Sequence, residues 1–373
     1  MLCGLCLPHC PTYRHDRVEG EGPRGRIRLA EGLASARLDR ADAGAWSGLD
    51  HCLGCRRCEA VCPAGVQYGD LLVAARALQR QQRPPPVRQR LLEGLVARPR
   101  LLGAALATLR RLRPLLPGRL RRQVPPIPPA ARWPAVTAAV GRRRGSVALF
   151  LGCLARRLDL PVQRAAISVL TRLGWEVHLP PGQGCCGALH LHAGAEAGAR
   201  RLGRANATAF ADGRHAAVLV SASGCFDSLR QSLPEATPPV RELLEFIAAD
   251  PQLAALRLRP LATAVALHVP CTQGSVVAAP DAAAALLRRI PGLVLHPVAG
   301  HGCCGAAGNH VLLQAGRAAA LREPLLDAIV ASAAPRGCSG NIGCRLHIVA
   351  GLAARGQPIT MQHPIELLAE ALP

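Results

Sequence analysis

A spacing of cysteines that occurs twice between residues 153 and 344 restricts the possible folds of this chain more than any other pattern in it. In each copy a lone cysteine comes 32 positions before a Cys-Cys-Gly, and another cysteine closes the copy 39 or 40 positions beyond the pair. The two copies are Cys153, Cys185, Cys186 and Cys225, and Cys271, Cys303, Cys304 and Cys344. One spacing kept twice to within a residue predicts an internal duplication, with repeats over 147–260 and 261–373.

Each repeat has the pattern of an α/β unit. Apolar runs end just before the two lone cysteines, and a second apolar run precedes each Cys-Cys-Gly; these predicted strands are 147–151, 264–269, 176–179 and 293–296. A helix with Leu170 or Leu286 on its apolar face is expected between the strands of each repeat. Alternation of strand, helix and strand predicts two α/β domains with mainly parallel sheets.

A different cysteine pattern lies near the N-terminus, where Cys52-x2-Cys55-x2-Cys58-x3-Cys62-Pro63 follows a shorter run of Cys3, Cys6 and Cys10. In such runs the three closely spaced thiolates bind one cubane cluster, and the fourth thiolate binds the neighbouring cluster. We therefore expect one [4Fe-4S] cluster on Cys52, Cys55, Cys58 and Cys10. A second would use Cys3, Cys6 and Cys62 and lack one ligand. We expect the natural start to lie upstream of Met1; the alternative is that this cluster has three cysteine ligands, is labile or is lost. Zinc, the alternative for four thiolates, does not use this spacing.

The segments around these runs are predicted to be helical. Ile27, Leu29, Leu33 and Leu38 recur at helical spacing, which favours an α-helical ferredoxin-type domain over 1–82. A basic, proline-rich connector follows over 83–146, and its leucines between 101 and 116 also have helical spacing. That helix either packs on its own protein with a solvated arginine face, or docks on a partner subunit or a membrane surface.

Composition excludes several classes of function. All 45 basic residues are arginine, so we discount the net charge of +21 as a sign of nucleic-acid binding, and aromatic residues make up only 2%. No run of about 18 uncharged apolar residues predicts a membrane span. Met1 runs directly into the first cysteine pattern, so we expect no secretory signal and a cytoplasmic location. There, reduced cysteines are metal ligands rather than disulfides.

The chain resembles the iron–sulfur subunit of glycolate oxidase (glycolate dehydrogenase). The resemblance extends over nearly its whole length and rests on segments such as Cys52-Leu53-Gly54-Cys55-Arg56-Arg57-Cys58-Glu59, Gly184-Cys185-Cys186-Gly187-Ala188-Leu189 and His363-Pro364-Ile365-Glu366. It implies an electron relay in a hetero-oligomer on the inner face of the cell membrane. A separate flavin-containing subunit would oxidise glycolate, and quinone or a similar acceptor would receive the electrons. Lactate and glycerol-3-phosphate dehydrogenase complexes have similar subunits and remain alternatives.

In the wider family, which includes heterodisulfide reductase, the Cys-Cys-Gly motif ends in Cys-x2-Cys. Here Ala222 and Asn341 replace the first cysteine of that ending, so each repeat offers four thiols instead of five. This difference argues against disulfide reduction and leaves an iron–sulfur centre, a zinc site or a structural relic open.

Several other residues have a plain structural interpretation beside a functional one. Arg24 and Arg26 either neutralise clusters or form surface pairs, and Cys338 is expected to be a small core residue. Histidines near the cysteines are expected to be ordinary hydrogen-bonded or exposed residues rather than ligands; they are His190, His192, His301, His310 and His347. No phosphate-binding glycine loop is present, so no flavin, nicotinamide or catalytic site is expected in this chain.

Overall fold

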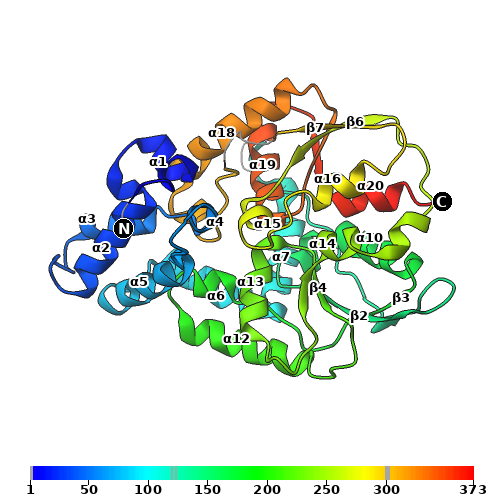
Figure 1. Ribbon diagram of the computed structural model, residues 1–373, viewed down its shortest axis with the longest axis horizontal. Helices are drawn as coiled ribbons and strands as arrows, with labels where there is room; N and C mark the ends of the chain where they lie inside the picture. Colours follow the sequence, from blue (N-terminus) through cyan, green and yellow to red (C-terminus); the bar gives the residue numbers. More distant parts are fainter. Residues whose placement is uncertain (1–2, 119–120, 122–123, 299–302) are drawn as a thin grey trace.

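The N-terminal part of the computed structural model is helical (Figure 1), and residues 3–373 are described apart from 119–120, 122–123 and 299–302. Its helices are α1 (Pro11–Asp16), α2 (Pro23–Ala34), α3 (Ala43–Asp50), α4 (Arg57–Ala60) and α5 (Tyr68–Gln82). Leu33, Trp46 and Leu49 are fully buried between them. The expected helix over the insert ends before Leu38, because Ala36 adopts a left-handed conformation (φ 56°) that α2 cannot continue through.

The described part of the connector includes the helices α6 (Val87–Val96) and α7 (Pro99–Leu112). Helix α7 buries Leu102, and it begins at a proline that suits the first helical position. Leu101, Leu112 and Leu115 remain exposed. The helix therefore packs on its own protein with one face and leaves leucines on another. The connector ends in a short strand, β1 (Val136–Thr137).

The two repeats have the same order of elements. The first consists of β2 (Gly145–Phe150), α9 (Ala155–Leu158), α10 (Leu160–Arg172), β3 (Trp175–His178), α11 (Ala188–Leu191), α12 (Glu196–Ala209), β4 (Val218–Val220), α13 (Ser223–Ser232), β5 (Val240–Glu242) and α14 (Leu243–Ala248). The second consists of β6 (Thr263–His268), α15 (Cys271–Ser275), α16 (Ala282–Leu287), β7 (Leu293–Pro297), α17 (His310–Leu313), α18 (Ala315–Ala331), β8 (Arg336–Ser339), α19 (Ile342–Ala354), β9 (Thr360–Gln362) and α20 (Pro364–Glu370).

Each repeat forms a parallel sheet of the same topology. The strand orders are β3-β2-β4-β5 and β7-β6-β8-β9, and β1 joins the first sheet antiparallel to β3. The predicted α/β fold and all four predicted strands are confirmed, with ends that differ by a residue or two. Parallel strands end at one edge of their sheet, so segments after β2, β3 and β4 meet there, as do those after β6, β7 and β8.

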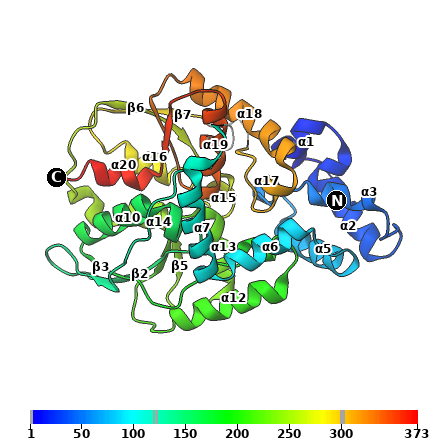
Figure 2. The same cartoon turned by 180° about the vertical axis from the view of Figure 1, so that it is seen from behind.

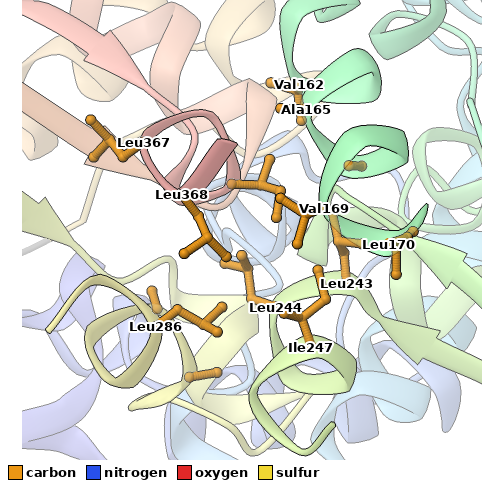
Figure 3. Packing of buried hydrophobic residues seen from close by; sticks show 14 of the residues in the cluster. Val162, Ala165, Val169, Leu170, Leu243, Leu244, Ile247, Leu286, Leu367 and Leu368 are labelled. Atoms are coloured by element: carbon orange, nitrogen blue, oxygen red, sulfur yellow. The ribbon is translucent and has the colours of Figure 1, made fainter. Parts of the chain in front are cut away.

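The main hydrophobic core lies between the repeats and joins them into one body. Helices α10 and α14 of the first repeat pack against α20 and α16 of the second, and Figure 3 shows their leucines and valines meeting. Leu170, Leu243 and Leu368 are fully buried there. Each such leucine stabilises the fold by about 1.5–3 kcal/mol.

The N-terminal domain docks on both repeats, at the side of the molecule opposite the C-terminus (Figure 2). Arg56 pairs with Asp227 of the first repeat at 2.7 Å, and Arg76 donates to the carbonyl of His192 at 2.8 Å. On the second repeat, Arg317 pairs with Asp16 and Glu21. These contacts fix the N-terminal cysteines relative to those of the repeats.

Candidate metal centres

Four cysteines from separate segments line one small cavity in the N-terminal domain. They are Cys10, which precedes α1, Cys52 and Cys55, which lie between α3 and α4, and Cys58 within α4. Pro11 fixes the first position of α1 and so places Cys10 at the start of that helix. The structure thus brings together the four thiols expected to share one cubane.

Positive charge surrounds this thiol group. Arg26 is 1% exposed and donates to the sulfur of Cys10 at 3.6 Å, to Glu21 at 2.8 Å and to the carbonyl of Gly48. Burial alone would raise the pKa of Cys52, but Arg26 and Arg76 outweigh it and lower that pKa. Burial raises the pKa of Cys58 to about 12. Arg26 therefore belongs to the site, while Arg24 forms an ion pair with Glu19 at the surface.

The other three N-terminal cysteines lie near one another. Cys6 has Cys62 and Cys3 as electrostatic neighbours, and burial raises the pKa of Cys6. Backbone N–H groups of Val66 and Ala64 point to Cys62 and lower its pKa. The loop after Cys62 thus stabilises a thiolate.

The cysteines of the first repeat gather at the carboxyl edge of its sheet. Cys153 follows β2, Cys185 and Cys186 follow β3, and Cys225 lies in α13 after β4. The thiol of Cys185 lies beside Cys153, and that of Cys186 lies beside Cys225. As expected for adjacent residues in extended chain, the two members of the pair face different partners.

The second repeat repeats this arrangement. The thiol of Cys304 donates to the sulfur of Cys344 at 2.8 Å, and Cys271 lies beside Cys303. The hydrogen bond with Cys304, together with burial, raises the pKa of Cys303 well above its ordinary value. Burial also raises the pKa of Cys271 to about 11. A metal that binds these cysteines must therefore displace their protons.

Glycine and polar side chains hold each Cys-Cys-Gly in place. Gly187 and Gly305 adopt left-handed conformations, and their N–H groups donate to the sulfurs of Cys185 at 3.5 Å and Cys303 at 3.3 Å. Asn206 donates to the carbonyl of Cys185 at 2.9 Å, and the ring of His347 hydrogen-bonds the carbonyl of Cys304. The ring of His347 therefore supports the second Cys-Cys-Gly by a hydrogen bond to the backbone of that motif.

The positions that lack a fifth cysteine lie at the boundary between the repeats. Ala222 is buried against Ile342, and the side chain of Asn341 approaches Gly224. Asn341 also donates to the sulfur of Cys344 at 3.4 Å. A hydrogen-bond donor therefore stands beside the closing cysteine of the second repeat.

Cys55 connects the N-terminal set of four cysteines to the second repeat. It packs against the hydrophobic cluster of Leu53, Cys303 and Leu321, and α4 contacts α15, the helix that begins at Cys271. Cys271 and Cys303 are its electrostatic neighbours, and burial raises its pKa well above the ordinary value. The guanidinium of Arg57 lies close to the same three cysteines. Both of these neighbouring cysteines belong to the second repeat.

The structure also places Cys338 and the histidines that lie near the cysteines in sequence. Cys338 is fully buried in β8 as a core residue, as expected. His190 and His310 are buried and His192 is exposed, while His301 lies outside the described residues. Burial lowers the pKa of His310 to about 4.

Sequence reasoning missed Arg57 and Arg76, and it did not single out Tyr68, whose hydroxyl donates to the sulfur of Cys52 at 3.5 Å. Among 45 arginines, nothing in the sequence distinguishes the few that turn inward.

The donor sets fit iron–sulfur clusters. Four thiols from a Cys-x2-Cys-x2-Cys run and a distant cysteine line one cavity, which is the ligand set of a cubane. In the described part of the chain, no three cysteine, histidine or acidic side chains converge on a point suited to a single ion. A cubane does not need this, because its thiolates bind different irons.

Comparison with known proteins agrees with these features. Residues 1–66 match a family described as a 4Fe-4S dicluster domain, and residues 147–230 and 265–349 each match a cysteine-rich domain. The chain is 30% identical to the glycolate oxidase iron–sulfur subunit of Escherichia coli, over 99% of this chain and 93% of that protein. It is 29% identical to a probable glycolate oxidase iron–sulfur subunit of Bacillus subtilis, over 100% and 93%. Lactate utilization protein A of Anoxybacillus flavithermus is 25% identical over 60% of this chain and 98% of its own length.

Proposed function

This chain belongs to the family of glycolate oxidase iron–sulfur subunits, and on that premise we propose that it relays electrons from a flavin-containing subunit to a membrane acceptor such as quinone. The flavin subunit would oxidise glycolate to glyoxylate. Two [4Fe-4S] clusters would be held by Cys10, Cys52, Cys55 and Cys58, and by Cys3, Cys6 and Cys62. Such clusters supply the transfer of single electrons.

The observation that carries this proposal is the packing of Cys55 against the cluster that contains Cys303, with Cys271 as a further electrostatic neighbour. An electron relay needs its centres in sequence, and this contact puts the N-terminal thiol group beside the second repeat. Leu53 and Leu321 are buried at the junction and keep water from it. Arg57 supplies positive charge both to the N-terminal set of cysteines and to the cysteines of the second repeat. Positive charge favours the more negative, reduced state of a cluster that these cysteines would hold.

We assign the thiols of the two repeats to a further iron–sulfur centre, with zinc as the alternative. Their raised pKa values mean that either metal would release protons on binding. Ala222 and Asn341 still argue against disulfide reduction, since neither can form a disulfide.

We place the complex at the cytoplasmic face of the membrane. No helix in the described part of the chain is long and apolar enough to cross a bilayer. Contact with the membrane or a partner would therefore use surfaces such as α7, with its exposed leucines and its arginines.

The first test uses the chain purified without oxygen, alone and with its flavin partner. Alone, it should contain iron and acid-labile sulfide, give iron–sulfur EPR signals and oxidise no glycolate. With the partner, glycolate should reduce the clusters. Turnover by the lone chain, or zinc without iron, would refute the proposal. The similarity to lactate utilization protein A makes lactate the second candidate, and reduction by lactate but not glycolate would establish it.

A matched pair of variants tests the order of the relay. Cys271→Ser should perturb the EPR signal of the cluster on Cys10, Cys52, Cys55 and Cys58, because Cys271 lies beside Cys55. Cys153→Ser, its counterpart in the first repeat, should leave that signal unchanged at equal N-terminal iron content. Equal effects of the two variants would contradict the proposed order.

A further inference from the structure

A cavity of about 770 Å³ lies between α5, α6 and the start of α12, apart from the N-terminal cysteines. Its volume is that of a site for a small molecule. Five arginines and two glutamates line it: Arg80, Arg90, Arg98, Arg200, Arg201, Glu93 and Glu196. The wall is therefore positively charged.

The acidic residues of this wall are already neutralised. Glu93 is buried and pairs with Arg80 at 2.7 Å, and it also accepts a hydrogen bond from Gln89 at 3.0 Å. Glu196 pairs with Arg200 at 3.3 Å. The guanidinium groups of Arg90, Arg98 and Arg201 have no acidic partner among the described residues, which leaves a net positive charge facing the cavity.

The N-terminus of α12 opens into the same cavity. This helix has 14 residues, and Ala195 at its N-cap offers no side-chain acceptor for the first N–H groups. Ala195, Glu196, Ala197 and Gly198 all line the cavity. Free N–H groups and the positive end of the helix dipole favour an anion at this position.

His190 gives an independent sign that a ligand binds in this cavity. Its side chain lines the cavity and is only 4% exposed, yet Nδ1 has no hydrogen-bond partner in the part of the chain that the structure describes. The ring is pressed against Gly198, where a Cβ would lie 2.7 Å from Cδ2. A buried polar nitrogen without a partner needs an explanation, and a ligand bound in the adjoining cavity is one.

We propose that this cavity is a binding site for a small anion that carries phosphate or carboxylate groups. Arg90, Arg98 and Arg201 supply the charge, the start of α12 supplies N–H donors, and His190 supplies a polar contact at the wall. The ligand is either a free metabolite-sized anion or the headgroup of an anionic lipid, which share this chemistry. The site is separate from the proposed electron relay and does not depend on it.

Calorimetric titration of the full chain with pyrophosphate, at low ionic strength and without oxygen, tests the site. Saturable binding of one equivalent is expected. Arg201→Gln should weaken it about tenfold, the effect of one lost charge-assisted hydrogen bond. Arg204→Gln removes the same charge from α12 outside the cavity and should change affinity less than about twofold. Absence of saturation, or equal weakening by both variants, would overturn the proposal.

Vesicles of phosphatidylglycerol distinguish the two sources of the anion. If they bind the protein, and either pyrophosphate or Arg201→Gln abolishes this binding, the ligand is a lipid headgroup. If pyrophosphate binds and the vesicles do not, it is a free anion. Vesicle binding that survives both treatments, with no pyrophosphate binding, would overturn the site.

Discussion

Arg345 of the second repeat forms a buried ion pair with Asp159 of the first. Arg345 also donates to the carbonyl of Ser339 at 2.8 Å, so the charge is held at the boundary between the repeats. This pair and the helices of the shared core bind the two halves of the duplication together.

Breaking this pair should be costly. Asp159→Asn leaves the charge of Arg345 buried without a counter-charge and should lower the free energy of unfolding by about 3–5 kcal/mol. Urea unfolding of the anaerobic protein measures this. Asp327→Asn, which removes a surface partner of Arg355, should cost less than about 1 kcal/mol. A loss below about 1 kcal/mol in Asp159→Asn would show that the buried pair is not a stabilising contact.

A second prediction concerns pH and Glu242. This carboxyl is fully buried and accepts a hydrogen bond from Gln273 across the repeat boundary at 3.0 Å. Burial raises its pKa to about 7, so the folded state binds its proton more tightly than the unfolded state. The contribution of Glu242 to the free energy of unfolding is therefore largest below pH 4.5. It falls by about 3 kcal/mol as the pH rises through about 7.

Glu242→Gln should remove this pH dependence and make the protein more stable than wild type at pH 8. Thermal unfolding between pH 5 and pH 8 measures the difference. Glu235→Gln, at an exposed position, should follow the wild-type curve. Parallel curves for wild type and Glu242→Gln would mean that Glu242 does not titrate in this range.

The two Cys-Cys-Gly glycines should differ in tolerance to alanine. Both adopt left-handed conformations, with φ of 86° at Gly187 and 72° at Gly305. A Cβ at Gly305 would lie 2.1 Å from the carbonyl oxygen of Ala318, whereas one at Gly187 would meet nothing closer than 3.4 Å. Gly187→Ala should cost about 1–2 kcal/mol, and Gly305→Ala at least about 3 kcal/mol. Chemical denaturation measures both, and equal costs would contradict the packing around Gly305.

Arg26 should set the reduction potential of the nearby cluster. Removing its positive charge from beside Cys10 and Cys52 disfavours the reduced state, so Arg26→Gln should lower the potential by about 60 mV, a tenfold change for one electron. EPR-monitored redox titration measures the shift at equal iron content. Arg24→Gln removes an arginine two residues away that is paired with Glu19 at the surface. The same shift in both variants would contradict a specific role for Arg26.

Much of the fold could be predicted because the relevant signals are local. The strand before Cys153 and its counterpart before Cys271 are continuous apolar runs, as buried parallel strands require. The helix expected through Leu38 stopped early because Ala36 takes a left-handed conformation, which nothing in that segment of sequence indicates.

The grouping of the cysteines can be predicted from the chain alone, since the ligand spacing of a cubane and the duplicated spacing are both local patterns. The placement of the groups cannot: it is the packed fold that brings Cys55 to the second repeat and puts Arg26 and Arg57 beside the thiols. These relations depend on how helices and sheets pack over long separations in sequence. Every arginine has the same charge in the sequence, and only packing determines which of them is buried beside a thiol.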